Sequence, residues 1–448
     1  MIVKDKELKK QLKKLMIPIV FQTLMMNAVS FGDTFMLGFL DQNSLAAVSL
    51  ASQVTFVLNL FSWTLTGGAT VLSAQYTGKG DTDTVRRIFG LILRWSMMIS
   101  AVFFWASFFA PELLMRAFTN SPEMIAIGAD YLRITSFSYL FVGIGQSYLC
   151  MLKICDRAKA GSVITIGIVI LDLFLNAVFI FGLFGSPAMG AKGAALTTSV
   201  SKFLEMAVVM AFAFLSKMIR PKAIFMVKFS LEKEFWRFAF PICINAMLWG
   251  GGITLYSVII GHLGNDATAA YSIVNVIKNL LISIGSGLGS ATGIILGNAF
   301  GENKFDTGKK YGAQLSRFSV FLGMISATLA VLIGPLFILL FKTNEQTNSY
   351  LVWMIAFCAL NCLGRCINDT VIVGVFYSGG DTRFDAVSLA VSMWGIIVPL
   401  ALCAAFWWKI PVALVYFIIA SDEIIKLPWV YSHYKKYRWV RNITKENI

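Results

Sequence analysis

Long apolar segments separated by short polar ones dominate the pattern of hydrophobic and polar positions along this chain. A helix of about 20 residues crosses a hydrocarbon core of about 30 Å. Segments of at least that length lie near residues 16–40, 45–75, 89–110, 123–152, 160–183, 190–216, 235–263, 267–300, 312–341, 349–377, 386–408 and 410–432. They lack the alternation of period two that strands need, and an open sheet cannot satisfy its backbone in lipid. The pattern predicts an all-α integral membrane protein with twelve transmembrane helices.

The pattern also occurs twice. Residues 18–83 return without a gap as residues 241–306, at a constant offset of 223, and Pro18 matches Pro241. Because each half holds an even number of spans, both halves enter the membrane from the same side. A pseudo-two-fold axis along the membrane normal then relates two six-helix bundles. We expect an N-terminal lobe at residues 1–216, a cytoplasmic linker at 217–234, and a C-terminal lobe with a basic tail at 235–448.

Small residues four positions apart follow one helix in each half. The second copy has Gly285, Gly289, Gly293, Gly297 and Gly301, and the first has Ser62, Thr66, Thr70, Ala74 and Gly78. A spacing of four keeps these residues on one side of a helix. Each half should therefore have a smooth seam where another backbone approaches closely.

Composition supports a membrane protein, because 57% of the residues are hydrophobic and only 14% are charged. The net charge of +14 comes from basic residues that are concentrated in alternate polar segments. Lys426 and Lys435 belong to the last of these segments. The segments predicted to be external keep only Arg116, Lys192, Lys342 and Lys409. This positive-inside distribution predicts a multi-pass plasma-membrane protein with both termini in the cytoplasm. It disfavours nucleic acid as a partner, since no aqueous domain carries the charge.

The chain offers little for a metal, a redox cofactor or an enzyme. Its seven cysteines include Cys358, Cys362 and Cys366 on one helical face, without a Cys-x-x-Cys pair or a nearby histidine. An intramembrane enzyme would need a catalytic set that His262 and His433 cannot supply, since they lie near opposite ends of spans. We expect no cofactor and no catalytic residues.

An ionisable group at membrane depth costs several kcal/mol and so usually has a task. Asp33 lies midway along the first predicted span, about two helical turns after Asn27. Asp172 on the fifth span precedes Asn176 by one turn, so the two share a face. Two carboxylates in one poorly solvated pocket favour binding of a proton or Na⁺. We therefore predict a coupling-ion site at these residues.

The second half carries a weaker candidate. Arg365 and Asp369 are one turn apart on the tenth span, where they either neutralise each other or serve an ion or cargo. Asn245 lies on the seventh span, and Tyr256 occupies the position equivalent to Asp33. Ion chemistry is therefore expected mainly in the first half.

Other polar and aromatic residues could contact cargo or neutralise charge. The candidates for cargo contacts are Gln53, Phe56, Asn59, Trp63, Met247 and Asn275. The remaining intramembrane or near-interface charges include Lys202, Glu205, Lys278, Asp422 and Glu423, which we expect to pair or to reach the interface.

An ordered set of motifs resembles the multidrug and toxic compound extrusion (MATE) family, most closely its DinF-like branch, over nearly the whole chain. The motifs are Gly32-Asp33-Thr34-Phe35, Gly38, Leu45-Ala46-Ala47, the Gly78 and Gly301 turns that end repeat helices, Gly374, and Gly379-Gly380-Asp381-Thr382-Arg383. The resemblance implies a coupling site at Asp33, Asp172, Asn176 and Thr198, which would also be the place for Na⁺. The acid precedes the amide on the fifth span here, the reverse of the order expected from the family.

The resemblance implies a monomeric antiporter in the bilayer that exchanges H⁺ or Na⁺ for amphipathic, cationic organic compounds by alternating access. The alternative is a flippase for lipid-linked oligosaccharides of the same superfamily. Such flippases usually have extra helices and a more charged cavity, and neither feature is evident in this sequence.

Overall fold

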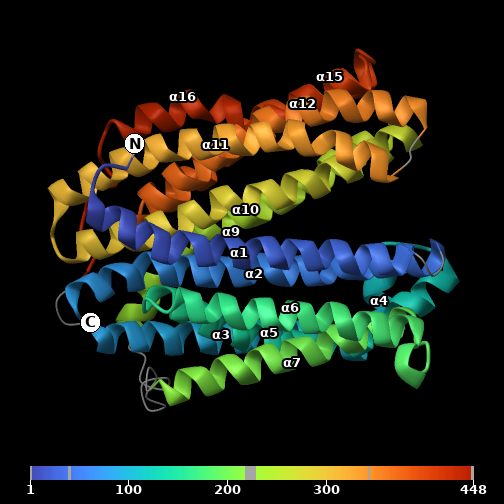
Figure 1. Cartoon of the computed structure of the whole chain (residues 1–448), viewed down its shortest axis with the longest axis horizontal. Coiled ribbons are helices and arrows are strands. Elements are labelled where there is room, and N and C mark those ends of the chain that lie inside the picture. Colours follow the sequence, from blue (N-terminus) through green and yellow to red (C-terminus); the bar gives the residue numbers. More distant parts are fainter. Residues whose placement is uncertain (1–2, 39–41, 217–228, 342–343, 445–448) are drawn as a thin grey trace. The chain divides into compact units, whose positions relative to one another are not determined.

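The computed structural model describes the backbone of residues 3–38, 42–216, 229–341 and 344–444, and the side chains of these residues except 30, 31, 33–35, 37, 38, 42 and 339–341. Over this range the regular structure is helical and contains no strand, which confirms the predicted all-α class. Figure 1 shows the helices as long rods joined by short connections.

The first half contains the helices α1 to α7. Their bounds are α1 (Lys6–Gly38), α2 (Gln42–Lys79), α3 (Thr82–Phe109), α4 (Pro111–Arg116), α5 (Pro122–Ile154), α6 (Ala158–Phe181), the short 3₁₀ turn η1 (Leu183–Gly185) and α7 (Ala191–Leu215). Local chemistry places several ends. Asp81 accepts a hydrogen bond from the Thr84 amide at the start of α3, and Gly182 ends α6 in the left-handed conformation, with φ of 75°.

The second half contains longer helices and several irregular ones. Their bounds are α9 (Phe229–Gly261), α10 (Asn265–Gly301), α11 (Phe305–Phe341), α12 (Glu345–Asn368), η2 (Asp369–Phe376), α13 (Arg383–Leu389), η3 (Ala390–Ile397), α14 (Val398–Leu402), η4 (Cys403–Trp407), α15 (Val412–Ala420) and α16 (Asp422–Tyr434). The segments η2, η3 and η4 are π-helical. Such segments are rare and often lie at functional sites.

The predicted spans agree with the helices to within about ten residues at their ends. Among the described residues, eleven helices are long and apolar enough to cross a membrane, from the one at Lys6–Val29 to the one at Arg383–Trp407. The twelfth predicted span, 410–432, is interrupted at Ser421, so that α15 and α16 are each short. The linker predicted at 217–234 lies partly on 217–228, outside the described residues, and partly on the beginning of α9.

The chain divides into two compact units. One, here called the C-terminal unit, comprises Met1–Val20, Ala74–Gly80 and Trp236–Asn447, and the other, the N-terminal unit, comprises Phe21–Ser73 and Asp81–Phe235. The units therefore do not coincide with the two sequence halves, because α1 and α2 each contribute to both. The lobe boundaries drawn from the repeat remain a prediction.

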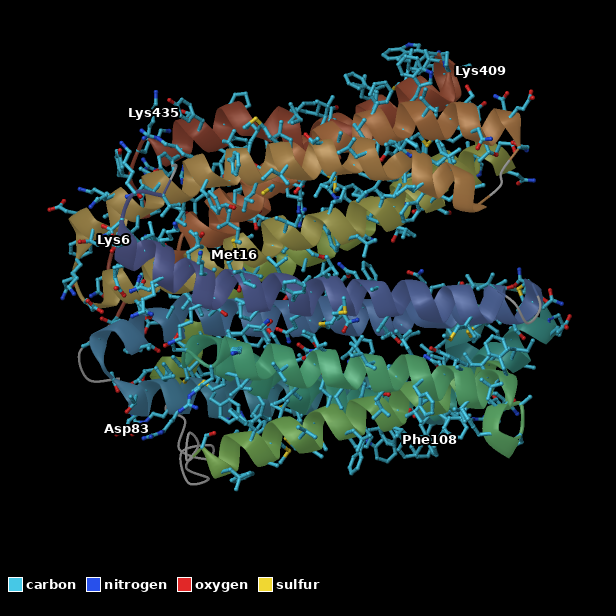
Figure 2. The ribbon with its side chains drawn as sticks, in the orientation of Figure 1. Lys6, Met16, Asp83, Phe108, Lys409 and Lys435 are labelled. Carbon is cyan, nitrogen blue, oxygen red and sulfur yellow. The ribbon has the colours of Figure 1, made fainter. Side chains whose placement is uncertain are left out.

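Each unit has its own apolar core. In the N-terminal unit α5 packs against α3, α6 and α7, and Tyr139 and Leu132 lie fully buried among them. In the C-terminal unit α12 packs against α10, α11, α15 and α16, around Met354 and Tyr416. Figure 2 places Lys6 and Lys435 at one end of the C-terminal unit and Lys409 at the other, in agreement with the alternation of basic segments.

The small-residue seam of α10 allows close backbone contacts, as its spacing predicts. A Cβ atom added to Gly285 would lie 2.8 Å from the Cα of Cys366, and one added to Gly289 would lie 2.5 Å from the Asp369 carbonyl oxygen. The part of the seam at Gly285 and Gly289 thus lies against α12 and η2.

The C-terminal end of the same seam packs against the C-terminal end of α2 within the C-terminal unit. Added Cβ atoms on Gly78 and Gly301 would collide with the backbone of Asn298 and Gln75, respectively. These glycines were predicted to mark the turns that end their helices, and α2 and α10 do end at Lys79 and Gly301. The residues with left-handed backbone that follow are Gly80 (φ 80°) and Asn303 (φ 60°).

Candidate functional site

A buried polar cluster links three helices of the N-terminal unit, α1, α6 and α7. Thr165 donates a hydrogen bond to Glu205 over 3.1 Å and accepts one from the Gln22 amide over 3.0 Å. The other oxygen of Glu205 lies 2.9 Å from the Lys202 ammonium. Gln22, Thr165 and Glu205 are each at most 3% exposed, so the cluster is held inside the unit.

Asp172 and Asn176 belong to the same region of this unit. Thr165, Asp172 and Asn176 are spaced by seven and four residues on α6, so they share one face of the helix. The Asn176 amide donates to the Asp172 carboxylate over 3.2 Å, and both residues are buried. Among the described side chains, Lys202 and Glu205 on α7 are charged groups close enough to Asp172 to act on it electrostatically. The predicted Asp172 and Asn176 pair is therefore close to an ion pair.

The other predicted members of the coupling site are placed less directly. The backbone of Asp33 lies in α1, but its side chain lies outside the described residues. Thr198 donates its hydroxyl to the Ala194 carbonyl, one turn earlier on α7, over 3.0 Å. Asn27 is half-buried on α1. The structure thus brings Asp172 and Asn176 together and leaves the rest of the set as a prediction.

The C-terminal unit contains a larger charged network. The Arg365 guanidinium lies 2.9 Å from Asp369 and 3.0 Å from Glu423, and Glu423 also lies 3.0 Å from the Lys426 ammonium. Ser286 on α10 donates to Asp369 over 2.9 Å. Lys426, which was counted among the cytoplasmic basic residues, is only 4% exposed and belongs to this network.

The break at Ser421 positions this network. A helix interrupted inside a lobe leaves backbone carbonyls without helical partners, and these need other donors. Asn361 donates to the Ala420 carbonyl over 3.0 Å and to Asp422 over 2.7 Å, and Asn368 donates to both the carbonyl and the carboxylate of Glu423. Asp422 and Glu423 thus occupy the first turn of α16, where the helix dipole favours negative charge.

The second-choice residues have different surroundings. Arg365 pairs with Asp369, as one of the two readings predicted, and stacks over Trp249 with 5.7 Å from guanidinium carbon to ring centroid. Tyr256 is 3% exposed and lies in the apolar core of its unit. Asn245 is half-buried on α9.

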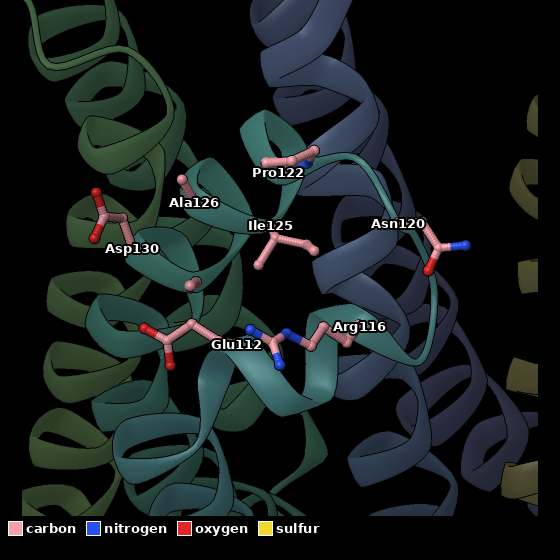
Figure 3. Close-up of a pocket in the computed structure, with 8 residues that line it drawn as sticks. Glu112, Arg116, Asn120, Pro122, Ile125, Ala126 and Asp130 are labelled. Carbon is pink, nitrogen blue, oxygen red and sulfur yellow. The ribbon is translucent and has the colours of Figure 1, made fainter.

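The candidate cargo residues lie on α2, α9 and α10. Gln53 is exposed and Trp63 is 52% exposed, whereas the others are half-buried, namely Phe56, Asn59, Met247 and Asn275. A cavity of about 600 Å³ lies elsewhere, around the connection from α4 to α5, where Glu112, Arg116 and Asp130 face it (Figure 3). It contains none of the predicted site residues.

Among the described residues, no group of three or more His, Cys, Asp or Glu side chains gathers as a metal site. Cys358 and Cys362 have sulfur atoms 3.9 Å apart and are buried with Cys366. Their surroundings agree with the predicted packing role.

The residues that complete the two clusters were predicted only in part. Lys202 and Glu205 were expected to pair or to reach the interface, and their pairing is confirmed. Their position in mid-span and their spacing of three could also have marked an ion pair facing the lobe interior. Gln22, Thr165 and Ser286 carried no comparable signal, because single amides and hydroxyls are common in membrane helices.

The chain is similar to known proteins over nearly its whole length. The sequence matches the MatE family over residues 18–178 and 241–427. It is 22% identical over 429 residues to the uncharacterized transporter YisQ of Bacillus subtilis, covering 95% of this chain and 93% of that protein. It is 23% identical over 454 residues to the probable multidrug resistance protein NorM of Thermotoga maritima, covering 99% and 96%.

Solved structures share the fold. A transporter of the MOP superfamily from Pyrococcus furiosus has a TM-score of 0.84 with 17% identity, covering 96% of each chain. The Vibrio cholerae MATE transporter VcmN in its bent form also has a TM-score of 0.84, with 15% identity, covering 96% of this chain and 97% of that one. Since the family match spans more than half of the sequence, this chain belongs to the MatE family, the multidrug and toxic compound extrusion transporters, and is a multi-pass membrane transporter rather than an enzyme.

Proposed function

We propose that this chain exports amphipathic organic compounds, organic cations among them, in exchange for H⁺ or Na⁺. The observation that carries the proposal is the presence of two buried carboxylates in the N-terminal unit, Asp172 and Glu205, of which Glu205 forms an ion pair with Lys202. The names of several relatives as probable multidrug resistance proteins support the type of cargo.

A carboxylate that is short of positive charge can couple two fluxes. Burial makes an uncompensated negative charge costly, so a cation from the side of higher concentration binds to it. The bound cation changes the relative stability of two conformations only if it binds one of them more tightly. We propose that cation binding at Asp172 favours the conformation that releases cargo, and that cation loss favours the one that accepts it.

The coupling site in this proposal consists of Asp33, Asp172, Asn176 and Thr198. Carboxylate, amide and hydroxyl oxygens are ligands that suit Na⁺, and the same carboxylates can carry a proton. The hydrogen bond from Asn176 to Asp172 shows that the reversed order of acid and amide still brings the two groups together.

The charged network of the C-terminal unit is proposed as the second choice for ion binding. Asp369 is already paired with Arg365, so a cation there would have to compete with a guanidinium 2.9 Å away. This pairing is the reason for placing the first coupling site in the N-terminal unit.

Location and assembly are parts of the same proposal. We propose a monomer in the plasma membrane, with two six-helix lobes at 1–216 and 235–448 that alternate in access and with both termini in the cytoplasm. The flippase alternative is less well supported, because the relatives named above include multidrug resistance proteins.

The proposal is tested by reconstituting the chain in lipid vesicles and measuring export of a fluorescent amphipathic cation driven by a H⁺ or Na⁺ gradient. Asp172→Asn should lower the initial rate at least about tenfold, since one essential charge is removed, and Asp33→Asn should do the same. Asp130→Asn is the matched control, because Asp130 forms an exposed pair with Lys192 in the same unit. Unchanged export by both Asp172→Asn and Asp33→Asn would refute the assignment of the site.

A further inference from the structure

The two side chains of the Lys202 and Glu205 ion pair differ in burial. The Glu205 side chain is 4% exposed and its two oxygens are engaged by Thr165 and by Lys202. Thr165 is in turn bound by Gln22, so helices α1, α6 and α7 together fix the carboxylate. The Lys202 side chain is 27% exposed, and a lysine has a flexible four-carbon stem with a compact charge at its end. Lys202 is therefore the more exposed member of the pair, and its stem allows more than one position of the charge.

A second carboxylate lies within the electrostatic reach of this ammonium. Asp172 is on α6, seven residues after Thr165 and hence on the same helical face. Helix α6 packs against α7, and Lys202 and Glu205 on α7 are close enough to act on Asp172 electrostatically. Ser201, which neighbours Lys202 in the chain, is 1% exposed and also lies near Asp172, although its hydroxyl has no hydrogen bond of normal geometry.

The charges of this cluster do not balance. Two carboxylates and one ammonium leave one negative charge among the described side chains, and Asp33 on α1 is a further acid whose side chain lies outside them. One additional cation would neutralise the two described carboxylates. A cation that binds at Asp172 is therefore repelled by the nearby ammonium of Lys202.

We propose that Lys202 is a tethered counter-cation that competes with the coupling ion for Asp172 and so sets the affinity of the site. Glu205 holds the ammonium away from Asp172, and Thr165 and Gln22 hold Glu205. Lys202 and Glu205 are thus positioning residues with opposite effects. This inference rests on the proposed function, because it assumes that a cation binds at Asp172.

The two single variants should shift the coupling in opposite directions. Lys202→Gln removes the competitor, so the concentration of driving cation that gives half-maximal export should fall about tenfold, as expected for one unit charge several ångströms away at an effective dielectric constant of about 20. Glu205→Gln frees the ammonium to turn to Asp172, so the same concentration should rise about tenfold. Lys202→Arg keeps the charge and should stay within about threefold of the wild type.

The experiment measures, in vesicles, the concentration of driving cation that gives half-maximal export, with H⁺ or Na⁺ used according to which gradient drives export. The second readout is independent of transport, namely the rise in unfolding temperature that the same cation produces in the purified full chain. The double variant, with both Lys202→Gln and Glu205→Gln, should lie between the single variants. The matched control is Lys192→Gln, which breaks the exposed Lys192 and Asp130 pair of the same unit and should change neither readout.

A merely structural ion pair predicts another pattern. Both single variants would then lower the unfolding temperature alike and leave the half-maximal concentration within threefold, and shifts in the same direction would equally overturn the proposal. Should Lys202→Gln fail to fold, Glu205→Gln and Lys202→Arg still decide, because the first must weaken cation dependence and the second must not. Loss of export in Asp172→Asn, combined with no opposite shifts, would overturn this inference and leave the proposed function intact. The absence of any cation dependence in the wild type would overturn both.

Discussion

A single buried carboxylate, that of Glu423, forms ion pairs with two cationic side chains in the C-terminal unit. Its oxygens lie 3.0 Å from both Arg365 and Lys426, and Asn368 donates to it over 2.7 Å. Buried ion pairs add little stability compared with apolar packing, but removing one partner leaves an uncompensated charge. The contribution of Glu423 should therefore become visible only when it is removed.

Glu423→Gln should destabilise the protein by about 3 to 5 kcal/mol, because Lys426 remains buried after losing its ion-pair partner. The measurement is thermal or denaturant unfolding of the purified chain. Glu302→Gln is the matched control, since it removes an exposed partner of Lys304, and it should change stability by less than about 1 kcal/mol. Equal effects of the two substitutions would show that the network does not depend on Glu423.

At the scale of elements, the C-terminal end of α2 packs against α10 and is hydrogen-bonded to the C-terminal segment at residues 439–443. Gln75 is fully buried, donates to the carbonyls of Ser378 and Arg441 over 2.6 and 3.1 Å, and accepts from the Ile443 amide over 2.8 Å. Trp439 is also fully buried, and its backbone lies against Gly379. One glutamine thus joins three segments of the C-terminal unit that are far apart in the sequence.

Gln75→Leu should loosen the C-terminal segment, since it leaves a buried amide and two carbonyls without these bonds at about 1 to 3 kcal/mol each. Hydrogen exchange at the Ile443 amide should become at least about tenfold faster. Gln11→Leu, which removes only an exposed bond to Glu7, should leave that exchange rate unchanged. If Gln75→Leu behaves like Gln11→Leu, the segment is held by other contacts.

The contact between α2 and α10 needs the absence of side chains. Gly78→Ala should destabilise the protein by about 1 to 3 kcal/mol, because the new methyl group would overlap the backbone of Asn298. Gly167→Ala is the control, since nothing lies within 4 Å of its added Cβ atom and alanine favours a helix. A Gly78→Ala protein as stable as Gly167→Ala would contradict this packing.

At the scale of the whole molecule, local patterns predicted more than long-range ones. The spans could be predicted because hydropathy and helix length are properties of consecutive residues. The α10 seam could be predicted from a spacing of four, but its partners could not, since Gly301 and Gln75 are far apart in the sequence. The interruption at Ser421 has neither glycine nor proline at that position to mark it.

The candidate site shows the same division. Asp172 and Asn176 share one helix, so their spacing was sufficient to predict their contact. The bond from Gln22 to Thr165 and the pair of Arg365 with Glu423 cross between helices, and only the packing of the helices brings them together. Charged residues in apolar spans could be identified from the sequence, but their partners on other helices could not.

The central claim, cation-coupled export, is tested most directly by transport in vesicles that contain the wild-type chain and a fluorescent amphipathic cation. We expect export against the concentration gradient of that compound when a H⁺ or a Na⁺ gradient is imposed, and its loss when an ionophore collapses the gradient. Export at the rate of protein-free vesicles under both gradients, or export that persists after collapse, would contradict the account.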